Sequence, residues 1–341
     1  MEKIKVVLVG CGGISNAWLN TDVAREKVEI IGLCDINVHN AEIVKEKYNL
    51  ENAKIGSNLK EMLEELNPDV VFDLTIPLAH GEVTITALEH GCHVLGEKPM
   101  SDNIETAKAM VEAANKSGKT YAVIQNRRYA TSIRRLVSAL RSGVIGNITA
   151  VHSDFYLTID FGATNFRATM PHVLINDMAI HTFDAARMIM NADPISVYCE
   201  EWNPKGSWYE RDASAAAIFK MTDNIMYTYT GCWAASGNNT TWECSWRIMG
   251  DKGTISWDGA DDFKCELLQF EDGKPITVPF EIPEIEPIGY EHHSGVINNF
   301  IESLKNNTAP ETVSTDNIKS LAMVTGAIDS SIQGKKVEIK L

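Results

Sequence analysis

The stretch that decides the fold is KVVLVGCGGIS, residues 5–15. Its apolar run, residues 6–9, is short and rich in β-branched side chains, which is typical of a strand buried on both faces of a parallel sheet. A glycine-rich turn follows at once, and the next residues, which include Ala17, Trp18 and Leu19, favour a helix. A second apolar run, residues 28–34, predicts another strand and ends on Asp35. The order is therefore strand, glycine turn, helix, strand and acid.

This order is typical of a dinucleotide-binding fingerprint, G-x-G-x-x-G. Its first glycine permits the tight turn, and its second lets a pyrophosphate approach the backbone. The start of the helix then offers free N–H groups to the anion. A serine replaces the third glycine, and a residue this small still allows close packing of helix and strand. The predicted pyrophosphate-binding residues are Gly10, Gly12, Gly13, Ile14 and Ser15.

Asp35 stands about 20 residues beyond the turn, where the fingerprint expects an acid that binds the adenosine ribose. The next three residues, Ile36, Asn37 and Val38, include no cation that would accept a 2′-phosphate. A carboxylate at this place repels that phosphate, so the sequence predicts NAD rather than NADP as the cofactor.

Composition excludes several classes of protein. The chain has 341 residues with 44% hydrophobic and 23% charged residues, which is ordinary for a globular protein of two domains. A net charge of −15 argues against nucleic acid or an anionic membrane as partner. No apolar run is long enough to span a bilayer, and no leader is recognisable. Seven scattered cysteines without a C-x-x-C pair favour reduced thiols and a cytoplasmic location.

Strands and helices alternate through the first third of the chain. Further strands are expected at 69–74, 93–95 and 121–124, and helices at 79–90 and 104–116, with another near 59–66 that Ser57 caps. Such alternation predicts an α/β domain with a doubly wound parallel sheet over residues 1–124. Ligands of these sheets bind at the carboxyl ends of the strands. Thr75, Pro77, Glu97 and Lys98 lie at such ends, as do Gly10 and Asp35.

Strand-like stretches dominate after residue 125. Seven of them lie between residues 148 and 270, and helices are expected near 132–141, 174–190, 290–305 and 316–332, with a last strand at 336–340. Strands that follow one another without helices indicate an antiparallel sheet. Residues 125–341 should therefore form an α+β domain with a large, mainly antiparallel open sheet.

The helix expected near 174–190 is apolar nearly all round, which predicts burial. It nevertheless carries Asp177, His181 and Asp184 at helical spacing, as one polar stripe. Burying such groups is costly unless they meet polar partners, a metal, a substrate or a cavity. A structural polar network would satisfy the stripe, and so would a substrate site. A metal site is disfavoured, because no second cluster of ligands completes a coordination shell.

Several motifs together resemble the glucose–fructose oxidoreductase / inositol dehydrogenase (Gfo/Idh/MocA) family. After the fingerprint come Pro77 with His80, then Gly91-Cys92-His93-Val94-Leu95 leading into Glu97-Lys98-Pro99. Arg127-Arg128-Tyr129 follows the last strand of the first domain, and Asp177 with His181 matches the family's motif on a second-domain helix. The resemblance covers essentially the whole chain.

This resemblance implies an NAD-binding Rossmann domain followed by a domain that binds substrate and self-associates. Thr75, Pro77, His80, Glu97 and Lys98 would then join the cofactor site. The implied substrates are sugars, inositols and their derivatives, and the implied assembly is a homodimer or homotetramer through the second domain's sheet.

The expected reaction transfers hydride between a secondary carbinol and the nicotinamide. His181 is the candidate general base, because imidazole titrates near neutrality. Lys98 would stabilise the developing alkoxide. Asp177 would bind a neighbouring hydroxyl, and Arg167 and His172 are further candidate substrate contacts. The expected catalytic residues are thus Lys98, His181 and Asp177.

Two alternatives remain open at this point. Some relatives keep NAD bound and use a transient oxidation to modify or cleave a glycoside, and others are non-catalytic NAD-binding regulators. Six of the seven tryptophans lie in the second domain, where strand tryptophans are most simply core or interface residues. They also suggest that the sheet's free face is apolar and self-associates. His292 and His293, on a polar helix, are expected to face solvent.

Overall fold

The computed structural model describes residues 3–341, which divide into two compact units. The first unit runs to Tyr129 and also takes in Ile288–Leu321 and Leu341, whereas the second comprises Ala130–Pro287 and Ala322–Lys340. The sequence predicted a single boundary between residues 124 and 125. The two observed units differ from that prediction mainly because a C-terminal segment returns to the first unit. The assignment of substrate binding to the second part stays a prediction.

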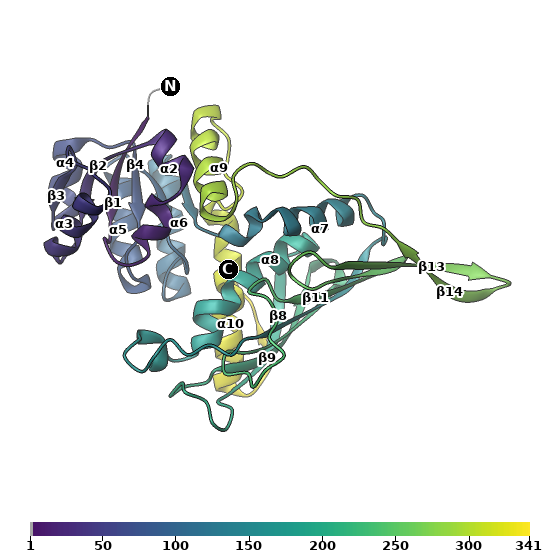
Figure 1. The fold of residues 1–341 in the computed structure, drawn as a ribbon. Coiled ribbons are helices and arrows are strands. Elements are labelled where there is room, and N and C mark those ends of the chain that lie inside the picture. The colour runs from purple at the N-terminus through teal and green to yellow at the C-terminus, as the bar shows by residue number, and fades with distance from the viewer. Residues whose placement is uncertain (1–2) are drawn as a thin grey trace. The chain divides into compact units, whose positions relative to one another are not determined.

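The first unit contains a six-stranded, fully parallel sheet of order β3-β2-β1-β4-β5-β6 (Figure 1). Its strands are β1 (Ile4–Val9), β2 (Val28–Cys34), β3 (Lys54–Gly56), β4 (Val70–Asp73), β5 (His93–Gly96) and β6 (Tyr121–Val123). The predicted doubly wound sheet is confirmed. β3 was not predicted, because its three residues are polar or only half-buried and form no apolar run.

Helices cover both faces of this sheet, and their apolar residues form two separate core clusters. They are α1 (Ser15–Leu19), α2 (Asp22–Lys27), α3 (Val38–Lys47), α4 (Leu59–Leu66), α5 (Pro77–Glu89), α6 (Ile104–Ser117) and α9 (His292–Asn306). Ser57 was the wrong cap for α4, since the side chain of Asn58 accepts the bond from Glu61 N. Gly118 ends α6 in the left-handed conformation.

The C-terminal segment packs on the first unit through α9 and the first part of α10 (Ser314–Gln333). Lys27 on α2 donates to Asn298 Oδ1 at 2.6 Å and to Glu302 Oε1 at 2.9 Å, both on α9. Arg128 Nη2, in the buried Arg127-Arg128-Tyr129 motif, lies 3.2 Å from Asp316 Oδ2. This motif therefore helps to hold the returning segment in place.

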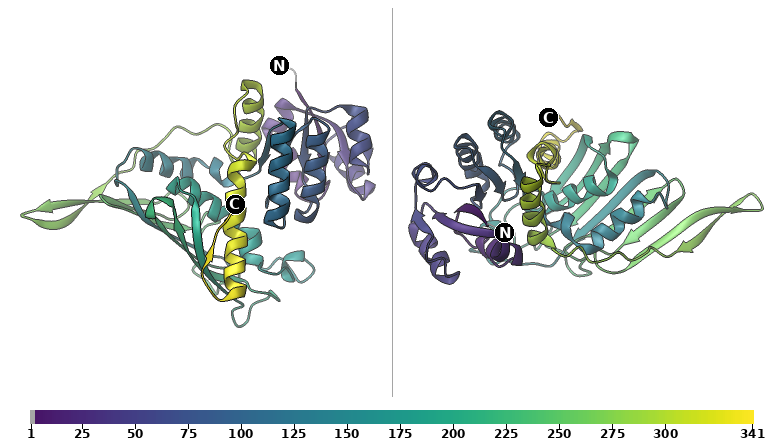
Figure 2. Two further views of the ribbon diagram at one scale, coloured as in Figure 1. Left: turned by 180° about the vertical axis from the view of Figure 1, so that it is seen from behind. Right: turned by 90° about the horizontal axis from the view of Figure 1, so that it is seen from above.

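The second unit contains a nine-stranded sheet of order β14-β13-β12-β11-β7-β10-β9-β8-β15. The strands are β7 (Ile148–Tyr156), β8 (Pro194–Trp202), β9 (Ser214–Met221), β10 (Met226–Cys232), β11 (Ser245–Gly250), β12 (Gly253–Trp257), β13 (Phe263–Glu271), β14 (Lys274–Phe280) and β15 (Val337–Glu338). Only β7 and β10 pair in parallel, so the mainly antiparallel sheet is confirmed. β14 was not predicted, and with β13 it forms a long hairpin that extends beyond the other strands (Figure 2).

Helices cover one face of this sheet: α7 (Thr131–Arg141), α8 (Ile180–Met190) and the second part of α10. Trp233, Trp246 and Trp257 are 1–3% exposed and lie in the core beneath those helices. The prediction that strand tryptophans are core residues is thus confirmed for these three. No helix of the described chain covers the opposite face (Figure 2). Among residues 3–341, no helix is both long and apolar enough to cross a membrane.

Candidate active site

The glycine turn is held tightly between neighbouring strands. Gly10 has φ +89°, and its N–H donates to Cys34 O at 2.8 Å. A Cβ at this position would lie 2.6 Å from Leu74 O, so only glycine fits. A Cβ at Gly12 or Gly13 would meet nothing within 4 Å. The turn is therefore fixed on its inner side and open on its outer side, as a bound pyrophosphate requires.

Asp35 connects the end of β2 to this turn. Its carboxylate accepts the N–H of Cys11 at 2.7 Å and that of Asn37 at 2.8 Å. Burial, with Asp35 adding to the effect, raises the pKa of the Cys11 thiol to about 12 and that of Cys34 to about 11. These thiols are protonated and unreactive at neutral pH.

Apolar side chains are exposed around the same edge of the sheet. Five of them follow the carboxyl ends of β1, β2 and β4, and they are Ile14 (39% exposed), Ile36 (96%), Val38 (38%), Ile76 (64%) and Leu78 (75%). Because β2, β1 and β4 are neighbours in the sheet, these side chains flank one edge. Exposed apolar surface rimmed by polar groups is typical of a ligand site. The arrangement suits the flat rings of a dinucleotide.

Polar groups at the end of β4 form a buried network around Asp73. Thr75 Oγ1 donates to Asp73 Oδ1 at 2.6 Å, Thr84 Oγ1 donates to Oδ2 at 2.9 Å, and His80 Nδ1 lies 3.0 Å from Oδ1. Burial alone would lower the pKa of His80, but Asp73 outweighs it and leaves that pKa raised. His80 is only 1% exposed, so it supports the Thr75 loop from inside the fold. Pro77 is the first residue of α5.

The Glu97–Lys98 turn stands at the end of β5. Glu97 N donates to Asp73 O at 2.8 Å, and the peptide bond between Lys98 and Pro99 is cis. The Glu97 carboxylate is buried and accepts Trp18 Nε1 at 2.7 Å and Lys98 N at 3.1 Å. Burial raises the pKa of Glu97, whereas the Lys98 charge and the Trp18 bond oppose that rise. Lys98, on this anchored turn, thus shares the carboxyl edge of the sheet with the glycine turn and Asp35.

The second unit carries Asp177 on a π-helical turn, η3 (Leu174–Ala179), directly before α8. The predicted helix is present, but it is not a uniform α-helix. In η3 the backbone bonds run from i to i+5, which changes the angle between Asp177 and the residues that follow. His181 is half-buried at the start of α8, and Asp184 is 2% exposed. Asp184 therefore belongs to the interior, whereas Asp177 and His181 retain some exposure. Such π turns are frequent at functional sites.

Arg167 binds Asp177 directly. Its Nε lies 2.5 Å from Asp177 Oδ2, and the guanidinium carbon lies 4.8 Å from the ring centre of Phe161 and 4.5 Å from that of Phe166. Phe161 in turn packs edge-on against the buried Trp233. The loop that carries Arg167 is therefore anchored to the core, and Arg167 orients the Asp177 carboxylate.

His172 pairs with a carboxylate that the sequence did not reveal. Its Nδ1 lies 2.8 Å from Glu201 Oε2, and the Glu201 side chain is 1% exposed. This bond raises the pKa of His172 and favours the imidazolium. His172 also has φ +52°, an uncommon backbone conformation for such a residue. Glu201 could have been suspected only as an acid on an inward-facing strand position.

One sequence prediction near the site was wrong. His293 does not face solvent, since its side chain is 21% exposed and its ring packs against Trp18 with 6.4 Å between ring centres. His292 is exposed, as predicted. The described residues include no group of three or more metal-ligating side chains suited to a metal ion.

Comparison with known proteins identifies the class. Residues 4–125 match the model of an oxidoreductase family with an NAD-binding Rossmann fold, and residues 133–256 match the GFO/IDH/MocA C-terminal domain. The chain therefore belongs to the Gfo/Idh/MocA family of oxidoreductases, and its first domain is that family's NAD-binding domain.

Relatives give the range of activities within the family. The D-apiose dehydrogenase of Paraburkholderia graminis is 24% identical over 367 residues, covering 100% of this chain and 91% of that protein. An inositol 2-dehydrogenase of Salmonella paratyphi B is 27% identical over 192 residues, covering 56% of this chain and 55% of the relative. The D-glucoside 3-dehydrogenase of Escherichia coli is 32% identical over 146 residues, covering 42% and 41%.

Solved structures share the fold. An oxidoreductase from Agrobacterium radiobacter, solved with NAD+, L-tartaric acid and magnesium, superposes with a TM-score of 0.83 at 20% identity and 99% coverage of both chains. A levoglucosan dehydrogenase, solved with NADH and levoglucosan, gives a TM-score of 0.82 at 16% identity with both chains fully covered.

Proposed function

We propose that this protein oxidises a secondary alcohol of a sugar or cyclic polyol with NAD, or catalyses the reverse reduction. The observation that carries the proposal is the placement of Lys98 on an anchored turn at the carboxyl edge of the NAD-binding sheet. The names of the relatives, which are dehydrogenases of apiose, inositol and glucosides, support a carbohydrate substrate.

The proposed cofactor residues fit what NAD needs. The turn residues Gly10, Gly12, Gly13, Ile14 and Ser15 would hold the pyrophosphate, because their outer side is open and their backbone is fixed. Asp35 would bind the adenosine ribose. Thr75 and Pro77 would face the cofactor. Glu97 and His80 are buried and would support the cofactor site, Glu97 through the backbone of Lys98 and His80 through Asp73. NAD supplies the hydride acceptor when bound.

The proposed chemistry assigns a role to each candidate side chain. His181 takes the proton of the reacting hydroxyl, and Lys98 stabilises the charge that develops on its oxygen. Asp177, which Arg167 holds in place, accepts a bond from a neighbouring hydroxyl. His172, as an imidazolium paired with Glu201, donates to a further substrate oxygen.

The test is a panel of pentoses, hexoses, glycosides and inositols with NAD, in which formation of NADH is followed. Steady NADH production with one of these substrates is expected, and it should fall in Lys98→Ala. If no member is oxidised, and no corresponding ketone is reduced with NADH, the dehydrogenase proposal fails.

A glycoside-modifying activity is the second candidate. A relative from Akkermansia muciniphila carries the name glycosyl hydrolase family 109 protein 2 and is 24% identical over 158 residues, covering 43% of this chain and 33% of that protein. Such an enzyme would retain NAD and release no NADH. Aryl glycosides in the panel distinguish the two, because release of phenol without net NADH would favour this candidate.

We further infer that the protein self-associates through the free face of the nine-stranded sheet, as a homodimer or homotetramer. Exposed apolar side chains lie along this face, and they include Tyr198, Ile218, Met226, Met249 and Leu268. The expected tryptophans are largely missing from it, because Trp233, Trp246 and Trp257 face the core. The seven cysteines are all buried and none forms a disulfide in the described chain, which supports a cytoplasmic location.

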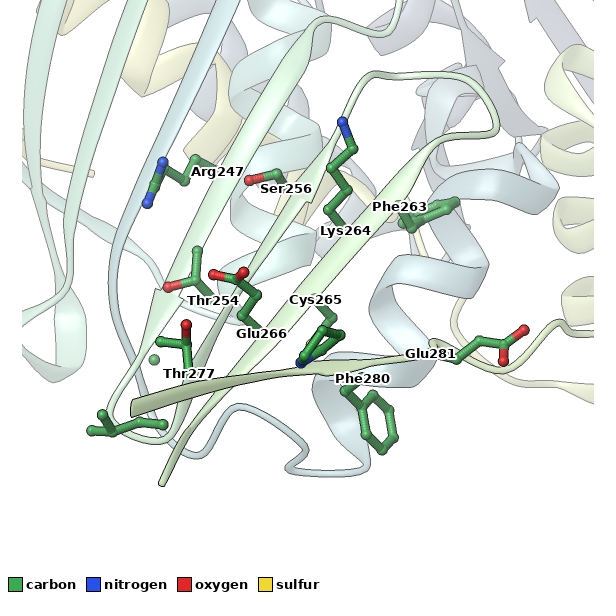
Figure 3. Close-up of a pocket in the computed structure, with 14 residues that line it drawn as sticks. Arg247, Thr254, Ser256, Phe263, Lys264, Cys265, Glu266, Thr277, Phe280 and Glu281 are labelled. Carbon is green, nitrogen blue, oxygen red and sulfur yellow. The ribbon is translucent and has the colours of Figure 1, made fainter. Parts of the chain in front are cut away.

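The same face has a hollow of about 780 Å³ across β11 to β14 (Figure 3). Its lining carries both signs of charge, with the basic Arg247 and Lys264 and the acidic Glu266 and Glu281. A second copy related by a two-fold axis can set acid against base across such a face. The hollow contains none of the residues proposed for catalysis.

A further inference from the structure

Three side chains from distant parts of the chain meet within the first unit. Trp18 lies on α1, Glu97 follows β5, and His293 lies in the first turn of α9. Glu97 Oε1 accepts the Trp18 Nε1 bond at 2.7 Å and lies 4.0 Å from His293 Nε2. The Trp18 ring is fixed from behind by Phe72, with 4.9 Å between ring centres. The carboxylate is therefore enclosed by two rings that belong to opposite ends of the sequence.

Enclosure of Glu97 has a consequence for its neighbour Lys98. A buried carboxylate is stable only where hydrogen bonds or cations compensate for its lost hydration. Trp18 supplies one bond to Oε1, and the N–H of Lys98 supplies another to Oε2 at 3.1 Å. The carboxylate thus anchors the backbone of Lys98, and whatever fixes the carboxylate also fixes the start of the lysine side chain.

His293 is a neutral member of this group. Burial, with the charges of His292 and Lys98 adding to the effect, lowers its pKa to about 4. At pH 7 the imidazole is therefore uncharged, and its 4.0 Å approach to Glu97 is a packing contact rather than an ion pair. A neutral ring excludes water from the carboxylate and does not compete with Lys98 for its charge.

We propose that His293 is a positioning residue, which packs on the Trp18–Glu97 pair and so holds the Lys98 turn in its reactive place. This inference rests on the proposed role of Lys98 in the reaction. It makes α9, which follows the Ala130–Pro287 part of the second unit in the sequence, a working part of the NAD-binding unit. The proposed role of His293 requires that the side chain beside Glu97 be neutral.

Several charged and titratable groups lie around His293. Arg127 and Arg128 are buried on the segment that packs against α9, and Glu291 precedes the helix. His292 is next to it on α9, Lys98 and Glu97 lie on the facing turn, and the His80–Asp73 pair lies behind Glu97. A cation placed at position 293 would repel the ammonium of Lys98 and attract the Glu97 carboxylate. A cation at the exposed position 292 would be screened by solvent.

Three variants test this requirement: His293→Gln, His293→Lys and, as matched control, His292→Lys. With the best substrate of the panel, His293→Lys should lower the single-turnover rate about 10- to 100-fold, because small misplacements cost that much. The loss in His293→Gln should be smaller, and His292→Lys should match the unmodified protein. The affinity for NADH, from energy transfer between tryptophan and NADH, should change less than the rate does. Equal rates in His293→Lys and His292→Lys would overturn the proposal.

A second measurement uses the unmodified protein and needs no substrate. Imidazole NMR, with His293→Gln for assignment, should show His293 neutral down to about pH 4, and its signals should shift when NADH is added. Titration near pH 6.5, or no shift with NADH, would overturn the inference. If instead Lys98→Ala keeps full turnover, the proposed function fails independently of the inference about His293. The NMR result still reports the protonation state of His293.

Discussion

At the scale of residues, the proposed chemistry depends on a few side chains whose roles can be separated by variants. Lys98→Ala should lower single-turnover hydride transfer about 100- to 1,000-fold, and His181→Ala about 100- to 10,000-fold. Both should bind NAD nearly as the unmodified protein does, since neither is expected to hold the pyrophosphate or the ribose. The double variant should lose less than the product of the two, because both residues act on one proton transfer.

An exposed lysine on α6, Lys108→Ala, serves as the control for these two variants. Rapid-mixing measurements of NADH formation, together with NAD titration, give both quantities. Near-normal turnover in His181→Ala would remove that residue from the mechanism and leave the polar groups of α8 with a structural role.

Asp35 is expected to decide the choice between NAD and NADP, also at the scale of single residues. NAD should bind more tightly than NADP, because the buried carboxylate at the end of β2 would repel a 2′-phosphate. Asp35→Ala should weaken NAD binding and lose the bond to Cys11 N. Calorimetric titration of both cofactors checks this, and tighter binding of NADP would show that Asp35 does not have the assigned role.

At the scale of elements, two variants of the glycine turn should separate an effect on folding stability from an effect on NAD binding. Gly10→Ala should lower the free energy of unfolding by at least about 1–2 kcal/mol, because φ is +89° there and a Cβ would clash with Leu74 O. Gly12→Ala should keep that stability, since its Cβ meets no atom within 4 Å, yet it should weaken NAD binding. Denaturant unfolding and NAD titration measure the two effects, and unchanged NAD affinity in Gly12→Ala would place the pyrophosphate elsewhere.

Strand β7 carries a pH-dependent pair on the free face of the sheet, His152 and Asp154, whose Nε2 and Oδ1 atoms are 3.0 Å apart. The bond to Asp154 raises the pKa of His152. Burial raises the pKa of Asp154, but the bonds from His152 and Thr230 outweigh it and leave that pKa lowered. The pair therefore stabilises the fold fully below the ordinary histidine pKa of 6.5, and less as pH rises through the raised value. On the acid side, the contribution is lost as pH falls below the ordinary aspartate value of 3.8.

Asp154→Asn should accordingly lower the free energy of unfolding by no more than about 1 kcal/mol at pH 5.5, since both side chains are partly exposed. The loss should be smaller at pH 9. Urea unfolding at the two pH values measures it, with the exposed Asp261→Asn as control. A loss that is larger at pH 9 than at pH 5.5 would contradict the pairing.

At the scale of the whole molecule, we expect a dimer or tetramer at micromolar concentration by light scattering. Ile218→Glu should dissociate it, because Ile218 is 48% exposed on β9 within the free sheet face. Ile332→Glu, on the exposed side of α10, is the matched control, since Ile332 is 69% exposed. A monomer in the unmodified protein would count against association, and dissociation by both variants would argue against this particular face.

The sequence by itself determined the first unit's sheet and the residues that follow its strands. Gly10, Asp35, Thr75 and Glu97 each follow a strand, and in a parallel sheet all carboxyl strand ends meet at one edge. Local patterns of this kind specify the local backbone geometry, so the fold class and the NAD-binding domain could be predicted from the sequence alone. The short polar strand β3 and the hairpin strand β14 lacked an apolar pattern and were missed for that reason.

Only the tertiary structure decided which distant side chains became partners. Asn58 rather than Ser57 caps α4, Glu201 pairs with His172, and His293 packs on Trp18 and Glu97. The π-helical turn that carries Asp177 also follows no period visible in the sequence. These features depend on contacts between segments far apart in the chain, and the hydrophobic period of one segment contains no information about the side chain that another segment brings to it.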